Sequence, residues 1–259
     1  MENKIICVDN IRKKFKLSKK QQKNEKCKEK IALDGLSFKV MKGEAYALLG
    51  PNGAGKTTAL RILATLMKPD VGDCIINGIS VKNEPDVART QIGFLTSELK
   101  LDGFFTPNYL YDFFSDLYGI PTNIKDIRKK NIFKIFGIDK FAEVKVEDLS
   151  TGMKQKVSIA ISLVHDPDII IFDEPTNGLD VITEKMVVDY LLKLKKEGKT
   201  LILSTHIFNL VEKIADRVGI IINGKMVYEN HMINFITENE KLEDIFFSIY
   251  FKEVGQDEK

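Results

Sequence analysis

A glycine-rich stretch in the first quarter of the chain has the residue types and spacing of a phosphate-binding loop. The segment GPNGAGKTT, residues 50–58, fits the pattern G-x-x-x-x-G-K-[ST] and lies between an apolar run and a segment with helical spacing. Glycines let backbone N–H groups turn toward phosphate oxygens, and the start of the following helix adds partial positive charge. The segment therefore predicts a nucleoside triphosphate site at Gly50, Pro51, Asn52, Gly53, Ala54, Gly55, Lys56, Thr57 and Thr58.

Two side chains of this loop have specific roles in this interpretation, and a later segment supplies their partner. The ammonium of Lys56 can reach the β- and γ-phosphates, and the hydroxyl of Thr57 can ligate Mg²⁺. The apolar run IIIF, 169–172, is followed by Asp173, which a parallel sheet would place at its carboxyl edge. A carboxylate there can hold the same cation, so we predict a Mg²⁺ site formed by Thr57 and Asp173.

Glu174 and His206 are the candidates for the chemistry at the γ-phosphate. Because successive strand residues alternate in direction, we expect Glu174 to point away from Asp173, where it can orient and deprotonate an attacking water. Alone, an Asp-Glu pair more often just ends a strand, but the phosphate loop upstream favours catalysis. His206 follows the apolar run TLILST, 200–205, whose strand would lie beside the phosphate loop. A lone histidine is more often structural, and this position favours a γ-phosphate contact.

A second helix start suited to an anion lies about a hundred residues after the first. In LSTGMKQKV, 149–157, Ser150 can cap the helix and donate to an anion, and Gly152 lets a ligand approach the backbone closely. The segment contains no acid, metal ligand or nucleophile. It therefore predicts a binding role without chemistry of its own.

The apolar periodicity indicates the elements that must position these residues. Strands alternate with helices after residue 44, which predicts a βαβ core with a mainly parallel sheet. Asn-Gly pairs between apolar runs in 74–79 and 219–228 predict two hairpins. The block 104–141 is predicted to hold two helices, the first starting at Thr106-Pro107. Further expected strands are 4–8, 36–40, 45–50, 168–172 and 200–204, and further expected helices are 57–67, 150–165, 183–197, 231–238 and 240–251.

Composition indicates a globular domain that does not cross a membrane. Of the 259 residues, 44% are apolar and 29% are charged, and no apolar run reaches the ~18–20 residues that a bilayer requires. The N-terminus lacks the apolar core of a signal peptide, so we expect a cytoplasmic protein. The three cysteines, Cys7, Cys27 and Cys74, show no spacing typical of a disulfide framework or a metal site.

The charge is concentrated in one segment. Residues 11–30 carry a net charge of +8, which leaves −6 on the rest of a chain whose total is +2, so the chain as a whole is not a basic nucleic-acid binder. Its part KLSKKQQKNEKCKEK, 16–30, has almost no apolar content and predicts an exposed loop. It could be merely solvated, attract anionic lipid head groups or contact RNA. Replacing its lysines by glutamine is expected to leave the chemistry of the phosphate site intact.

The chain resembles the ATP-binding subunits of ABC transporters. The resemblance rests on five segments that occur in this order: GPNGAGKTT, LSTGMKQKV, IIIFDEP, GLD and TH. The resemblance covers roughly residues 4–226 and implies ATP and Mg²⁺ as ligands. It also implies a head-to-tail dimer, in which Ser150, Thr151 and Gly152 of one subunit close over the ATP held by the other. This role would explain the second anion-binding helix start.

The resemblance assigns three more residues and a branch of the family. Asp180 would pass between the subunits near the catalytic water. Phe15 would stack on adenine, with a place in the core as the alternative. Ser97 stands near the position where the family often has a glutamine that reaches Mg²⁺, and its side chain is shorter. The variant signature LSTGMKQ, 149–155, resembles the branch that exports drugs or sodium ions.

The sequence thus predicts an α/β fold of the P-loop NTPase class. We expect a mainly parallel central sheet, an N-terminal antiparallel β subdomain and a helical subdomain at about residues 95–160. An ATP-binding domain, 1–226, would precede a short helical extension, 227–259.

The expected function is ATP hydrolysis that powers a separate membrane permease in an exporter. The alternative is a soluble ABC ATPase that acts on nucleic acid or ribosomes. We expect a homodimer or a paired ATPase subunit, no specific nucleic acid, and indirect attachment through the permease to the inner face of the cell membrane.

Overall fold

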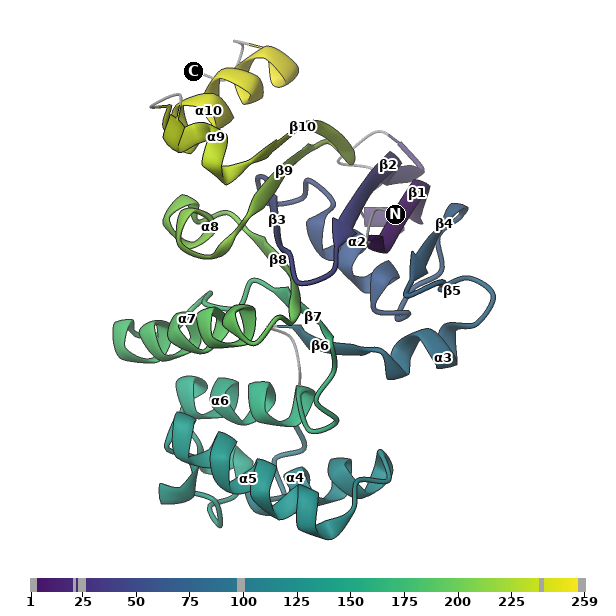
Figure 1. The fold of residues 1–259 in the computed structure, drawn as a ribbon. Helices are drawn as coiled ribbons and strands as arrows, with labels where there is room; N and C mark the ends of the chain where they lie inside the picture. The colour runs from purple at the N-terminus through teal and green to yellow at the C-terminus, as the bar shows by residue number, and fades with distance from the viewer. Residues whose placement is uncertain (1–3, 21, 23–26, 97–100, 238–239, 256–259) are drawn as a thin grey trace.

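A six-stranded sheet lies at the centre of the molecule, and it is mainly parallel, as expected (Figure 1). The computed structural model describes residues 4–20, 22, 27–96, 101–237 and 240–255. The strand order is β10-β9-β3-β8-β7-β6, parallel except for β10, which pairs antiparallel with β9. The strands are β3 Ala45–Leu49, β6 Ile92–Thr96, β7 Ile169–Asp173, β8 Thr200–Thr205, β9 Arg217–Ile222 and β10 Lys225–His231.

Alternation along β3 divides the core into two layers. Ala45, Ala47 and Leu49 pack on one side of the sheet with helices α6 and α7, whereas Tyr46 and Leu48 pack on the other side with α2 and the N-terminal sheet. Because both faces are covered, all five residues of β3 are fully buried, as parallel strands require. The helices are α2 Lys56–Leu63, α6 Thr151–Ser162 and α7 Val181–Lys196.

The second sheet is antiparallel, with the order β2-β1-β4-β5. Its strands are β1 Lys4–Lys16, β2 Glu29–Met41, β4 Val71–Ile76 and β5 Ile79–Ser80, and α3 Pro85–Thr90 follows. Both predicted hairpins form, with the turn residues Asn77-Gly78 and Asn223-Gly224 at positive φ. The predicted fold class is confirmed.

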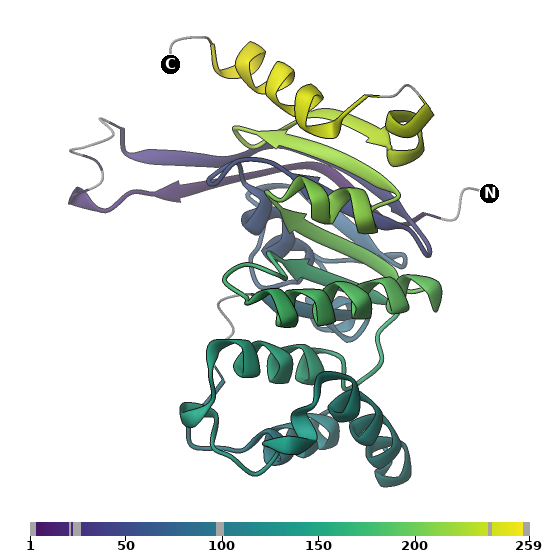
Figure 2. The same cartoon turned by 90° about the vertical axis from the view of Figure 1, so that its left-hand side faces the viewer.

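The two ends of the basic segment are strand, so the hairpin is longer than predicted. Leu17, Ser18, Cys27 and Lys28 lie outside both strands, as the loop prediction expects. The β1–β2 ladder continues outward to Lys16, which pairs with Glu29. Figure 2 shows this hairpin extending beyond the sheet on the side where the arrowheads of the parallel strands lie. The strands were expected to span only 4–8 and 36–40. Beyond Ile11 most side chains of β1 are exposed, so the apolar alternation along β1 disappears although the backbone ladder persists.

Three helices form a layer at one end of the sheet (Figure 1). They are α4 Pro107–Leu117, α5 Thr122–Phe136 and α6. The side chain of Thr106 accepts a hydrogen bond from Tyr109 N at 3.2 Å and caps α4 as predicted. Gly137, at φ 64°, ends α5. The short 3₁₀ turns Ile138–Lys140 and Val146–Asp148 lead back to α6.

The remaining helices close the molecule at the opposite end. α8 Phe208–Ile214 packs against α10 Leu242–Val254 through Phe208 and Phe246, whose ring centroids are 5.2 Å apart. α9 Met232–Thr237 follows β10 directly, and the expected boundary at residue 226 falls inside β10. In the part of the chain that the structure describes, no helix has both the length and the hydropathy for crossing a bilayer.

Candidate nucleotide site

The phosphate loop connects the buried strand β3 to α2. Gly53 and Gly55 have φ of 83° and 108°, which side chains rarely adopt. A Cβ on Gly55 would also lie 2.5 Å from the carbonyl oxygen of Ala32. These glycines are therefore required by the backbone geometry, as the sequence pattern predicts.

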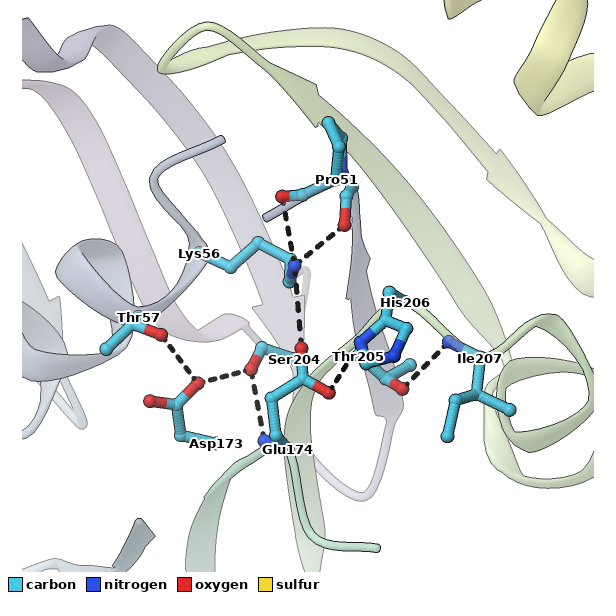
Figure 3. Close-up of polar contacts among 10 residues, drawn as sticks. Pro51, Lys56, Thr57, Asp173, Glu174, Ser204, Thr205, His206 and Ile207 are labelled. Carbon is cyan, nitrogen blue, oxygen red and sulfur yellow. Dashed lines mark hydrogen bonds and ion pairs between the residues drawn. The ribbon is translucent and has the colours of Figure 1, made fainter. Parts of the chain in front are cut away.

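Lys56 lies inside this loop and is almost fully buried. Its Nζ donates to Gly50 O at 2.7 Å and Pro51 O at 3.3 Å, and it lies 3.5 Å from Oε1 of Glu174 (Figure 3). Burial lowers the pKa of the ammonium, while Glu174 and then Asp173 act to raise it. An anion at the mouth of the loop would meet this ammonium and the first turn of α2 together.

Thr57 and Asp173 meet as predicted, and a third residue joins them. Thr57 Oγ1 donates to Asp173 Oδ1 at 3.0 Å, and Ser204 Oγ donates to the same oxygen at 2.5 Å (Figure 3). This set of hard oxygen donors fits Mg²⁺. Among the described residues, no three His, Cys, Asp or Glu side chains gather as a metal cage. Ser97 lies outside the described residues.

Glu174 reaches the pocket in a different way from the one predicted. β7 ends at Asp173, and Glu174 adopts a left-handed conformation with φ 53° instead of continuing the strand. Its N–H donates to Ser204 O at 3.1 Å, which ties the turn to β8. Strand alternation therefore does not separate the two carboxylates; the turn after β7 does. Glu174 Oε2 then lies 3.0 Å from Nδ1 of His206.

Lys56, Thr57, Glu174 and His206 line one cavity of about 470 Å³. Phe15 lies on its wall and is 37% exposed, so it is not the core residue that the alternative interpretation required. The lining consists of Phe15, Lys30, Ala32, Pro51, Asn52, Gly53, Ala54, Gly55, Lys56, Thr57, Thr58, Glu174, Asn177 and His206. The wall of the cavity thus combines an aromatic side chain, Phe15, with the backbone of the phosphate loop and several charged side chains.

The signature residues form a second group that does not line this cavity. Ser150 caps α6 as predicted, accepting a hydrogen bond from Met153 N at 3.3 Å. A Cβ on Gly152 would lie 3.3 Å from Oδ2 of Asp180, so the start of α6 contacts the start of α7. Asp180 caps α7 by accepting from Ile182 N and Thr183 N, both at 3.0 Å. Thr151 begins α6 beside these residues.

Residues 33–177 match the family model described as ABC transporter, which covers more than half of the chain. The chain belongs to the ABC transporter ATP-binding family. Members of this family are ATPases, so this chain is an ATP-binding ATPase.

Relatives and solved structures agree with this family membership. The chain is 36% identical over 215 residues to the ABC transporter ATP-binding protein NatA of Bacillus subtilis, covering 83% of this chain and 87% of the relative. It is 32% identical over 233 residues to the Nod factor export ATP-binding protein I of Ralstonia nicotianae, covering 90% and 69%. A dimeric structure of the ATP-binding cassette MJ0796 bound to ADP and Pi superimposes with a TM-score of 0.77 at 26% identity, covering 88% of this chain and 98% of that one.

Three residues of this ABC ATPase site were not predicted. Ser204 was part of the strand TLILST, and its contact with Asp173 depends on the pairing of β7 with β8, which has Asp173 opposite Ser204. Lys30 was assigned to an exposed loop, yet it lines the cavity, so the expectation that the lysines of 11–30 can be replaced without effect on the site does not extend to Lys30. Asn177 lies in the segment PTNGLD, 175–180, and its proximity in sequence to the candidate base Glu174 was the available signal.

Proposed function

We propose that this chain is the ATP-hydrolysing subunit of an exporter and that it drives a separate membrane permease through an ATP-dependent head-to-tail dimer. One observation carries the proposal: the helix start at Ser150 and Gly152 is suited to an anion but lies outside the cavity of its own chain. A second copy that supplies this helix start would complete the site. The export assignment is supported by NatA-type and Nod factor export relatives.

In the proposed bound state, the triphosphate lies along the phosphate loop with the base against Phe15. Lys56 holds the β- and γ-phosphates, and Thr57 and Asp173 would hold Mg²⁺. Such a cation supplies charge neutralisation at the phosphate oxygens. Ser204 fixes the rotamer of the Asp173 carboxylate by donating to Oδ1.

Hydrolysis needs one proton acceptor, and Glu174 is the proposed base. A water oxygen forms a bond to the γ-phosphorus as the bond from the γ-phosphorus to the β–γ bridging oxygen breaks, and ADP leaves with that oxygen. The water proton passes to Glu174. His206 lies 3.0 Å from Oε2 of this carboxylate and can hold it toward the γ-phosphate. Asp180 would lie beside the partner's catalytic water, since it adjoins Gly152 in the same chain.

We further propose the domain organisation that the sequence suggested. Residues 1–226 would form the ATP-binding domain, with a helical subdomain at about 95–160 that meets the permease, and 227–259 would form the extension. The chain would then be cytoplasmic and held at the inner face of the membrane by its permease. Closure on ATP and reopening after hydrolysis would perform the work, because the two states bind ATP differently.

The dimer can be tested by cross-linking two single-cysteine proteins in a background where Cys7, Cys27 and Cys74 are serine. One protein carries Asn52→Cys and the other Thr151→Cys, so a short bis-maleimide can join the two sites only between chains. Cross-linked dimer is expected with ATP in a Glu174→Gln background and not with ADP. A yield that ATP does not change would refute the head-to-tail arrangement.

The permease can be tested by purifying the tagged chain from native membranes. A polytopic membrane protein recovered in stoichiometric amount supports the transport assignment. The alternative, an ABC ATPase that acts on nucleic acid or ribosomes, depends on the basic segment 11–30 alone. RNA binding with a steep dependence on salt, and recovery with ribosomes instead of membranes, would favour that alternative.

A further inference from the structure

The cavity contains a second lysine that none of the sequence segments identified. Lys30 of β2 lies directly opposite Phe15 of β1 in the antiparallel ladder. Directly opposite residues project to the same face of a sheet, so both side chains point toward the cavity that they line. Ala32, two residues further along β2, lines the cavity as well.

The next pair in the ladder points the other way. Lys16 lies opposite Glu29, and this pair is one residue beyond the pair of Phe15 and Lys30. The side chain of Lys16 therefore projects to the opposite face of the hairpin. Lys16 is exposed, as Lys30 is, and does not line the cavity. The two lysines therefore have the same charge and nearly the same position, but only one faces the nucleotide site.

Lys30 also differs from other cations at the root of the hairpin. Arg12 pairs with Asp34 at 3.3 Å, and Lys13 pairs with Asp70 at 2.8 Å. Within the described part of the chain, no ion pair engages Lys30. Its ammonium is therefore available to an anion in the cavity, and a flexible lysine can reach a phosphate as a point charge.

We propose that Lys30 is a further nucleotide-binding residue whose ammonium pairs with the α-phosphate of the bound nucleoside polyphosphate. This assignment rests on the proposed position of the base at Phe15. Lys56 takes the β- and γ-phosphates inside the loop, so the phosphate that lies between the loop and Phe15 is the α-phosphate. Lys30 lines the cavity at its Phe15 end, where that phosphate must pass.

The assignment makes a specific prediction because ATP and ADP share the α-phosphate. Lys30→Gln should weaken the binding of ADP and of a non-hydrolysable ATP analogue by a similar factor, about two- to tenfold. The loss should shrink as salt is raised from low to high ionic strength, because a solvent-exposed pair is screened. Lys30→Arg should restore most of the affinity, and Lys16→Gln should bind both nucleotides as the unaltered protein does.

Calorimetric titration with ADP and with the ATP analogue separates the possible outcomes. The four proteins to titrate are the unaltered protein, Lys30→Gln, Lys30→Arg and Lys16→Gln. Unchanged affinity in Lys30→Gln, or an equal loss in Lys16→Gln, would overturn the contact. A loss for the ATP analogue alone would place Lys30 at the γ-phosphate and overturn the α-phosphate assignment. Lys56→Ala is the check on the site itself: if it also binds ADP and the analogue normally, the nucleotide lies elsewhere, and the proposed function fails together with the role of Lys30.

Discussion

The carboxylate of Glu174 lies 3.0 Å from Nδ1 of His206, and its other oxygen lies 3.5 Å from Nζ of Lys56. Glu174 thus stands between a residue of the phosphate loop and the residue that follows β8. Its side chain is largely buried, with 13% of it exposed. A carboxylate held by neighbours on both sides can receive a proton at a fixed position, which is the requirement for a general base.

Replacing Glu174 by glutamine is the first test of this role. The amide keeps the size of the side chain but cannot accept a proton from water, so ATP hydrolysis should fall by about 10²–10⁴-fold. ATP binding should persist, and ATP-bound dimer should accumulate. Phosphate release and size-exclusion chromatography with ATP measure the two effects. Glu212→Gln, on the exposed surface of α8, is the control, and normal hydrolysis by Glu174→Gln would exclude Glu174 as the base.

His206 should matter for hydrolysis more than for binding. Removing the imidazole by His206→Ala leaves Glu174 Oε2 without its neighbour, so kcat should fall by at least about tenfold, corresponding to ~1.4 kcal/mol in activation free energy. The affinity for ADP should change little, since His206 is not part of the phosphate loop. His231→Ala, at the exposed end of β10, is the matched control. Equal kcat values for the two variants would contradict the assignment.

Ser204 should support the Mg²⁺ site and the fold together. Ser204 Oγ donates to the buried carboxylate of Asp173, and removing a buried partner of a charged group costs about 1–3 kcal/mol. We expect Ser204→Ala to lower the free energy of unfolding by that amount in urea titrations and to raise the Mg²⁺ concentration for half-maximal ATPase activity. Ser162→Ala removes a hydroxyl bonded only to a carbonyl of its own helix, and it should change both quantities less.

The residues of the site could be predicted from sequence because their spacing is local. GPNGAGKTT needs only the order of its glycines, and Asp173 follows an apolar run that has to be a buried strand. The conformation of Glu174 could not be predicted, because its turn depends on a hydrogen bond to Ser204, a residue of a different strand. Ser204 and Lys30 were missed for the same reason: strand pairing joins positions that are far apart in sequence.

Elements of the fold that depend on adjacent residues could likewise be predicted, whereas those that depend on distant strand partners could not. The capped starts of α4 and α6 and the Asn-Gly hairpins follow from a few adjacent residues, and these predictions are confirmed. The predicted length of the β1–β2 hairpin was wrong, because the outer part of the hairpin has no buried face that would require an apolar pattern. Ladder hydrogen bonds do not depend on side-chain type, so lysine-rich strands such as Lys13–Lys16 and Glu29–Ile31 escape detection by periodicity.

Gly152 should be required for closure of the dimer. A Cβ at this position would lie 3.2 Å from Thr183 Oγ1 and 3.3 Å from Asp180 Oδ2, which is tighter than most side-chain contacts. In Gly152→Ala the side chains of Thr183 and Asp180 must therefore move slightly, and the added methyl group lies where the partner's phosphate would approach. We expect loss of ATP-dependent dimer and of hydrolysis, with ADP binding to the monomer unchanged. Normal dimer formation by Gly152→Ala in the Glu174→Gln background would contradict the role of this helix start.

The cap of α7 should make part of the stability depend on pH. Asp180 accepts hydrogen bonds from the hydroxyl and the N–H of Thr183, and these bonds lower the pKa of its carboxyl below the ordinary value of 3.8. A carboxyl whose pKa falls on folding stabilises the protein above its unfolded pKa, and this stabilisation is lost as the pH falls through the folded value. Asp180→Ala should therefore lower the melting temperature at pH 7 and lower it less at pH values below 3.8. Melting curves of both proteins across this range measure the difference, and a gap between them that does not narrow in acid would show that the ionised carboxylate is not the capping group.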